Sequence, residues 1–331
     1  MRYFLRRLGF YLVALWAAVT FNFIIPRLMP GDPTTTFLAK LRSQGHLSPA
    51  TLAALQADFG ITPNVPVWRQ YLDYLGAILH GNLGVSSSQF PSQVSTILGQ
   101  SLPWTIGLVG VSIVLSAVLG TIIGALLSWR HGSWYDTVVP PLLTFLSAIP
   151  YFWMALALVY IFALGLGWFP PDSPYDIFNV FPGWNMDYVL SVIQHALLPV
   201  ITLVVGSLGG WVLTMRNAMI TTLSEDYVLM AEAKGLPERQ VMTRYAARNA
   251  ILPSITSFSI SLGLIVGGAL LTEIVFNYPG IGFALFNAVA QNDYALVEGC
   301  FLVIALTVLL ANFLSELVYT FLDPRVRHGR G

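Results

Sequence analysis

The chain has 331 residues, of which 56% are hydrophobic and only 10% are charged, whereas roughly 25% of the residues in a soluble domain are charged. Sixteen basic and sixteen acidic residues cancel, so the sequence lacks the net positive charge expected of a nucleic-acid-binding protein. The single cysteine allows neither an intrachain disulfide nor a thiolate metal cluster, and the composition fits a polytopic membrane protein.

Six apolar runs are long enough for helices that cross a bilayer, which takes about 20 residues. They cover residues 8–25, 104–129, 137–168, 196–215, 250–272 and 300–322. The sequence therefore predicts an all-α polytopic membrane protein with six transmembrane helices.

The placement of arginine and lysine predicts the orientation of these helices. With the N-terminus inside, twelve of the sixteen basic residues lie on the cytoplasmic side, and four lie outside, namely Arg27, Lys40, Arg42 and Arg69. The positive-inside rule then places both termini in the cytoplasm.

This topology divides the chain into four segments. Residues 1–28 hold the N-terminal segment and first span, 29–101 an external region, 102–322 the core with spans two to six, and 323–331 a cytoplasmic tail. A cytoplasmic loop at 216–250 lies within the core. The first run is longer than the 7–15 apolar residues of a signal peptide and lacks a small-x-small cleavage site, so we expect it to remain uncleaved.

The external region contains two helical patterns. Residues 47–61 have an N-cap, a first-turn proline and a terminal glycine, at Ser48, Pro49 and Gly60. Residues 65–79 place apolar side chains on one stripe, as in an interfacial amphipathic helix. The stripe consists of Val67, Tyr71, Tyr74, Leu75 and Ile78. The region fits a lid or docking surface as well as a structural cap over the first span.

Prolines and glycines interrupt the apolar runs. Pro140, Pro141 and Pro150 should kink the third run, which could line a pathway or serve packing alone. Small residues allow close helix packing, and they predict contact between two glycine sets. One set is Gly206, Gly209 and Gly210, and the other is Gly263, Gly267 and Gly268.

A charged island follows the fourth run. Ser224 is expected to cap a helix that has Glu225 and Asp226 in its first turn, and Gly235 to end that helix in a left-handed conformation. Tyr227, Met230 and Ala231 should share one helix face. A second helix should begin at Pro237 and carry basic residues, namely Arg239, Arg244 and Arg248. The capping signals favour a defined cytoplasmic unit over an ordinary solvated loop.

The island resembles the cytoplasmic loop of permease subunits of binding-protein-dependent ABC importers, closest to the dipeptide, oligopeptide and nickel branch. The matching positions are Tyr227, Ala231, Ala233, Lys234, Gly235, Leu236, Arg248, Asn249, Ala250 and Pro253. Residues 6–8, 30–33, 278–282 and 322–325 also match, in the same order. The chain departs from the general permease signature at residues 229–231 and has 17 residues between Gly235 and Pro253, a spacing similar to that of the peptide branch.

The resemblance implies a type I ABC importer permease fold in the plasma (inner) membrane of a prokaryote. It implies an ATPase-coupling loop comprising Glu225, Asp226, Tyr227, Ala231, Lys234, Gly235, Arg239, Arg244, Arg248 and Asn249. The implied partners are a second homologous permease, two ATP-binding subunits and an extracytoplasmic solute-binding protein. ATP and magnesium would bind those partner subunits. This chain is expected to have no catalytic residue, cofactor or metal of its own, and neither Lys40 nor Lys234 is followed by the Ser or Thr of a P-loop.

The segment after the fifth run predicts an external element. Tyr278, Pro279 and Gly280 form a turn, and Phe283, Phe286 and Val289 recur at helical spacing. A polar tip follows, made of Gln291, Asn292 and Asp293. By resemblance the turn and tip contact the binding protein, whereas plain gate packing explains the pattern equally well. Just before the turn, Glu273 should be solvated near the interface, and His195 beside the loop before the fourth run should be solvated too.

An ion-coupled secondary transporter working without an ATPase is the alternative. It would show repeated halves with broken helices and paired acids near the midplane, and this chain shows one charged loop instead. The substrate stays open among peptides, oligosaccharides and nickel. An aromatic group at Tyr151, Phe152, Trp153, Tyr160 and Trp168 slightly favours stacking with sugar rings.

Overall fold

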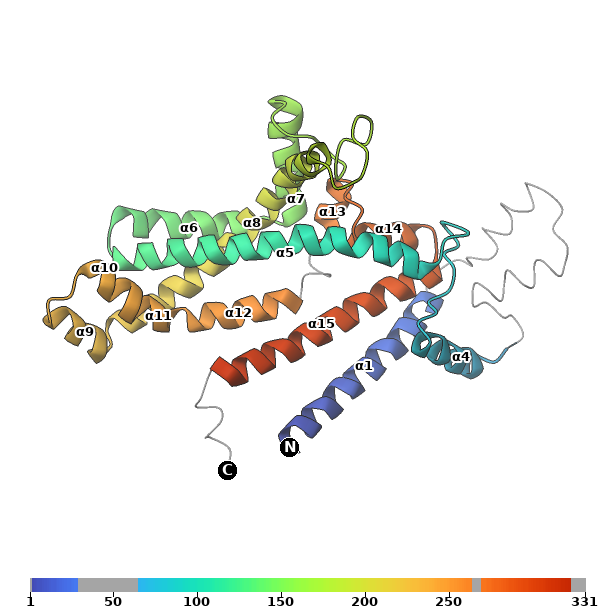
Figure 1. Cartoon of the computed structure of the whole chain (residues 1–331), viewed down its shortest axis with the longest axis horizontal. Coiled ribbons are helices and arrows are strands. Elements are labelled where there is room, and N and C mark those ends of the chain that lie inside the picture. Colours follow the sequence, from blue (N-terminus) through green and yellow to red (C-terminus); the bar gives the residue numbers. More distant parts are fainter. Residues whose placement is uncertain (1, 29–64, 264–268, 323–331) are drawn as a thin grey trace. The chain divides into compact units, whose positions relative to one another are not determined.

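The computed structural model describes residues 2–28, 65–263 and 269–322 (Figure 1). These residues fold into helices joined by turns, with one isolated β-bridge between Val85 and Gln93, which confirms the all-α class for the described part of the chain. They form two compact units. Unit 1 comprises residues from 1–105 and 279–309, and unit 2 comprises residues from 106–278 and 310–331.

Four of the described helices are long and apolar enough to cross a membrane. They are α1 (Arg2–Leu28), α5 (Val94–Trp129), α8 (Met186–Leu223) and α15 (Tyr294–Leu322). They account for the first, second, fourth and sixth predicted spans. The predicted fifth span divides into α12 (Leu252–Gly263) and α13 (Leu270–Val275), on either side of residues that the structure does not describe. The described residues therefore do not establish that the chain has six transmembrane helices.

The third predicted span is broken into α6 (Trp134–Ala148) and α7 (Tyr151–Leu158), which leads into the π-helix η1 (Val159–Gly165). The two halves meet at an angle of 97°, which confirms a kink at Pro150, whereas Pro140 and Pro141 lie inside α6. The break follows from Pro150, which lacks an N–H donor and forces the preceding residue out of the helical region. Ile149 accordingly has φ −73° and ψ 126°.

In unit 1, α4 (Val67–Leu79) packs on α1 through the predicted apolar stripe. The rings of Tyr71 and Tyr74 lie 5.2 and 5.5 Å from that of Phe23, and the hydroxyl groups of Tyr71 and Thr20 are 2.7 Å apart. Of the stripe residues, only Val67 is largely exposed. This half of the external region thus caps the first helix, whereas the predicted helix at 47–61 lies outside the described residues.

An ion pair ties α1 to α15 within the same unit. Arg27 donates to Glu298 Oε1 over 2.6 Å, and its guanidinium lies 3.5 Å from the centre of the Phe23 ring. Asn22 Nδ2 donates to the backbone oxygen of Glu298 over 2.6 Å. These contacts fix the C-terminal end of α1 to the N-terminal end of α15.

In unit 2, glycines let α8 approach its neighbours closely. A Cβ on Gly209 would lie 2.7 Å from the backbone oxygen of Leu143 in α6, and one on Gly206 would lie 2.4 Å from the ring of Tyr151 in α7. On α5, Gly120 and Gly124 face the α8 backbone at residues 211–216 in the same way. The described residues place Gly206 against α7 and Gly209 against α6, whereas Gly267 and Gly268 lie outside the described residues, so the pairing of the two glycine sets stays a prediction.

Candidate functional site

The charged island begins where α8 ends. Ser224 is the C-cap of α8, and its hydroxyl donates to the backbone oxygen of Thr221 over 2.8 Å. The following helix, α9 (Asp226–Ala233), has Glu225 as its N-cap without a side-chain cap bond. The prediction that Ser224 starts this helix is wrong, since α8 runs eight residues beyond the apolar run and uses Ser224 to stop. Asp226 occupies the first turn as predicted.

The end of α9 has the predicted left-handed glycine. Gly235 has φ +71°, and its N–H donates to the backbone oxygen of Glu232 over 2.8 Å. The N–H of Leu236 donates to the backbone oxygen of Ala231 over 3.4 Å. This pair of bonds is a Schellman motif, which satisfies carbonyls that a helix end leaves free. The chain therefore reverses sharply after Lys234.

The second half of the island is one helical stretch with a π-helical middle. It contains α10 (Glu238–Gln240), η2 (Val241–Ala246) and α11 (Ala247–Ala250), and Pro237 precedes it in an extended conformation. The predicted helix from Pro237 is confirmed, whereas its π-helical part was not predicted. We call residues 225–250 the coupling segment.

A small apolar core holds the coupling segment together and seats it on α8. Its buried members are Met215, Met219, Val228, Ala231, Val241, Ala246 and Ala250. Leu236, which follows the Schellman glycine, packs against the same core, as do Ala125 and Trp129 at the end of α5. The segment is thus a folded unit and does not have the character of an ordinary solvated loop. On α9 the buried face is Val228 and Ala231, and Tyr227 and Met230 point outward, which corrects the predicted face.

The predicted coupling residues differ in exposure and in their contacts. Ala231 is buried and can act on a partner only through packing. The charged members are all exposed, and they are Glu225, Asp226, Lys234, Arg239, Arg244 and Arg248. Tyr227 and Asn249 are brought together, because Asn249 Nδ2 donates to the Tyr227 hydroxyl over 2.7 Å and joins α9 to α11.

Exposed apolar side chains lie among these charges. Leu229 and Met230 on α9 are 51% and 59% exposed. An apolar patch with a charged rim is the arrangement found at protein–protein interfaces. The coupling segment therefore has the surface chemistry of a docking element.

The predicted turn at Tyr278, Pro279 and Gly280 leads into α14 (Ile281–Ala290), with Gly280 as its N-cap. Tyr278 is buried, and this burial, with a smaller contribution from Glu273, raises the pKa of its hydroxyl to about 12. Glu273 itself is only 1% exposed, so the expectation that it is solvated is wrong. Tyr278 and Glu273 are parts of a packed corner, which leaves little of the turn open to a partner.

The predicted polar tip is exposed only in part. Gln291 is exposed and Asn292 is half-buried with φ +53°, but Asp293 is fully buried. Asp293 Oδ1 accepts the N–H of Leu296 over 3.1 Å and so caps α15. Its other oxygen accepts the hydroxyls of Ser86 and Ser88 and the N–H of Ser88. Asp293 is thus an internal anchor for the loop that contains Ser86 and Ser88 and precedes α5. Only Gln291 and Asn292 remain as an exposed tip.

Replacing Asp293 with asparagine should loosen that anchor without removing the helix cap. Asparagine caps helices about as well as aspartate, but its amide cannot accept the three donors from Ser86 and Ser88 at one anionic oxygen. We expect a loss of about 1 kcal/mol in stability. A lower thermal midpoint in detergent and faster proteolysis within residues 86–93 would show it. Unchanged proteolysis would contradict the anchoring role.

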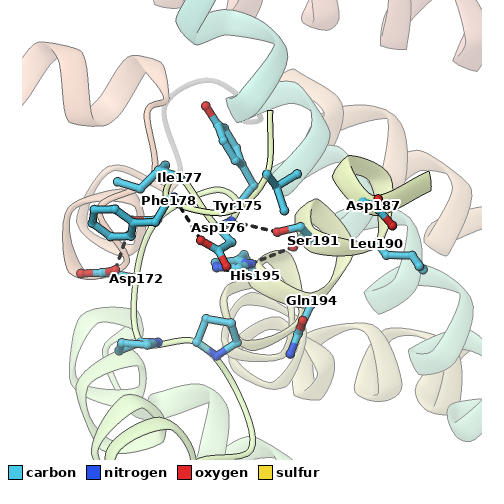
Figure 2. Close-up of a pocket in the computed structure, with 14 residues that line it drawn as sticks. Asp172, Tyr175, Asp176, Ile177, Phe178, Asp187, Leu190, Ser191, Gln194 and His195 are labelled. Carbon is cyan, nitrogen blue, oxygen red and sulfur yellow. Dashed lines mark hydrogen bonds between the residues drawn. The ribbon is translucent and has the colours of Figure 1, made fainter. Parts of the chain in front are cut away.

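A cavity lies between the 166–185 loop and the start of α8. Figure 2 shows this cavity, of about 550 Å³, with side chains of both segments around it. Asp176 accepts Asn179 Nδ2 over 2.9 Å and the N–H groups of Phe178 and Asn179, and these bonds lower the pKa of its carboxyl below the ordinary value. Asp176 therefore stays ionised at neutral pH.

His195 belongs to this cavity and was not predicted to do so. Its Nδ1 lies 2.7 Å from the backbone oxygen of Ser191, one turn earlier in α8, while the Ser191 hydroxyl accepts the N–H of Asp176 over 2.8 Å. The lining also includes Asp172 and Asp187 and no lysine or arginine. The cavity forms by folding of the loop onto α8, so the sequence gives little sign of it. The only signal is the pair of aspartates, Asp172 and Asp176, after Pro170 and Pro171.

Within the described ranges, no group of three His, Cys, Asp or Glu side chains is placed to hold a metal ion. The acidic cavity is therefore not identified as a metal centre.

Similarity to known proteins bears on what this arrangement does. Residues 117–328 match the family described as binding-protein-dependent transport system inner membrane component. The chain is 32% identical to a di/tripeptide transport system permease protein of Pseudomonas aeruginosa, with 98% of both chains covered. It is 30% identical to a dipeptide transport system permease protein of Alkalihalophilus pseudofirmus, covering 99% of this chain and 100% of the relative, and 29% identical to one of Escherichia coli K12, covering 99% of both.

Proposed function

Because the chain belongs to the family of inner membrane components of binding-protein-dependent transport systems, we propose that it forms half of the translocation pathway of a peptide importer driven by separate ATP-hydrolysing subunits. The observation that carries this proposal is the coupling segment, a folded and charge-rimmed element seated on the end of α8. A membrane subunit without a P-loop needs such an element to receive work from an ATPase.

The assembly that fits this role has four further components. A second homologous permease completes the pathway, two ATP-binding subunits contact the coupling segments, and a solute-binding protein delivers the substrate from outside. Both termini and the coupling segment face the cytoplasm, since the positive-inside rule requires it. The corner between α14 and α15 then faces outward.

The relatives support peptides as the substrate. The relatives named above are described as dipeptide or di/tripeptide permeases, and the similarity covers nearly the whole length of each chain. Of the aromatic group that favoured sugars, the Tyr151 ring packs against Gly206 in α8. Trp153, Tyr160 and Trp168 are largely exposed, so the preference for peptides rests on the relatives alone.

Reconstitution tests the function directly. The chain would be purified with the second permease and the ATPase subunits, placed in vesicles, and supplied with binding protein and labelled dipeptides or cello-oligosaccharides. We expect dipeptide uptake that requires ATP and the binding protein. Uptake driven by a proton or sodium gradient without the ATPase would support a secondary transporter and overturn the proposal, and ATP-driven uptake of oligosaccharides alone would overturn the substrate class.

The exposed tip gives a narrower prediction about the binding protein. Gln291→Ala combined with Asn292→Gly removes both polar side chains, keeps the positive φ that Asn292 adopts, and spares the buried Asp293. We expect basal ATP hydrolysis and assembly to be unchanged and the stimulation by loaded binding protein to fall. Full stimulation in the double variant would assign this corner to gate packing instead.

A further inference from the structure

A buried carboxylate joins the α5–α6 turn to α8. The side chain of Asp136, in the first turn of α6, is only 4% exposed. It accepts hydrogen bonds from Nε and Nη2 of Arg216 in a two-pronged contact, from Nδ1 of His131, and from the N–H of Gly132. These donors come from two elements that are 80 positions apart in the sequence. The turn is thereby tied to one point on α8.

That point on α8 is also where the coupling segment is seated. Met215 and Met219, one residue before and three residues after Arg216, are buried members of the core that holds the coupling segment. Ala125 and Trp129, at the end of α5 just before the same turn, pack against this core as well. A displacement of the coupling segment must therefore act on this short stretch of α8.

The other end of α6 is also fixed to α8. Ser147 Oγ accepts the N–H of Gly209 over 3.1 Å, and the α6 backbone at Leu143 is within contact distance of that glycine. Figure 1 shows α6 and α8 running side by side up to the bend that leads into α7. The Asp136–Arg216 pair lies at one end of this contact and the bend lies at the other.

We propose that Asp136 and Arg216 are positioning residues that transmit movement of the coupling segment to the bent α6–α7 pair, so that ATP hydrolysis and solute passage stay coupled. The inference rests on the proposed function. Neither residue touches ATP or solute in this scheme. Their contact makes α8 and the α5–α6 turn move together, because a buried carboxylate that separates from its guanidinium partner loses the opposite charge that compensates its burial.

The test uses the reconstituted complex and measures solute taken up per ATP hydrolysed. Arg216→Gln and Asp136→Asn each break the charge pair, and Arg130→Gln, at an exposed residue of the same turn, removes an equal charge as the matched control. Residues within a coupling network change coupling by about two- to thirtyfold when substituted. We expect a fall in that range for the first two variants and none for the control, with ATP hydrolysis and subunit stoichiometry retained.

The double variant Asp136→Leu with Arg216→Met covers the case in which a single variant fails to assemble. Replacing a buried ion pair with apolar residues of similar volume is often neutral or stabilising, so this variant should assemble. It should still take up less solute per ATP, because the two-pronged contact between Asp136 and Arg216 that ties the turn to α8 is gone. A wild-type ratio in the double variant, or ratios for the single variants equal to that of Arg130→Gln, would overturn this inference alone. Absence of ATP-driven uptake in the wild-type complex would instead overturn the proposed function.

Discussion

Replacing Gly124 with valine should force α5 and α8 apart and prevent stable assembly. A Cβ at this position would lie 2.6 Å from the backbone oxygen of Val212 and 2.9 Å from Cβ of Met215. Neither atom can move without shifting α8 itself. Overpacking of this kind costs about 3 kcal/mol, and helices in a membrane depend on close approach because they lack a hydrophobic driving force between them. The core of the coupling segment should loosen too, since Met215 belongs to it.

Gly107→Val provides the matched control on the same helix. Gly107 is exposed, and a Cβ there would meet no atom within 4 Å. The thermal midpoint of the purified chain and its recovery with partner subunits would be measured for both variants. Equal midpoints would show that the close contact between α5 and α8 does not stabilise the chain.

Replacing Gly235 with valine should uncouple ATP hydrolysis from uptake. Gly235 has φ +71°, and a Cβ there would meet nothing within 4 Å, so the whole penalty is backbone strain. A β-branched residue at positive φ is strongly disfavoured, at a cost of roughly 1–3 kcal/mol. Relief of that strain would open the Schellman turn and withdraw Leu236 from the apolar core. We expect weaker binding of the ATPase subunits and less uptake per ATP.

Gly235→Asn separates strain from loss of glycine, because asparagine tolerates the left-handed region. It should assemble and transport much as the wild type does. Subunit stoichiometry after purification and uptake per ATP are the measurements. If Gly235→Val keeps wild-type values of both, the role given to the coupling segment in docking is wrong.

Features that depend on near neighbours in the chain were predictable. Gly235 and Pro237 predict the end of α9 and the start of the next helix, and the structure has this end and this start where the sequence places them. Pro150 predicts a break in the third run, because a proline restricts the backbone of the residue just before it. The size of the bend was not predictable, because it depends on how α6 and α7 pack against α8.

Features that depend on distant partners were missed. Asp293 looks like part of an exposed polar triplet, but its partners Ser86 and Ser88 are 207 and 205 positions away. Gly206 and Gly209 look suited to any helix, and only the folded chain shows that they face α7 and α6. Asp136 and Arg216 carried no signal at all, since a lone acid and a lone base at the ends of apolar runs are ordinary in such sequences.

The π-helix η2 has a consequence for how this sequence diverges from its relatives. A π-helical turn holds about one more residue than an α-helical turn, so it can absorb a single inserted residue while the flanking helices keep their phase. Loss of one residue within Val241–Ala246 would convert the stretch to regular α-helix and leave Ala231, Ala250 and Asn249 on their present faces. Alignments of relatives should therefore place single-residue gaps here, between the glycine turn and the Arg248–Asn249 pair, and such gaps would mark conserved geometry despite unequal length.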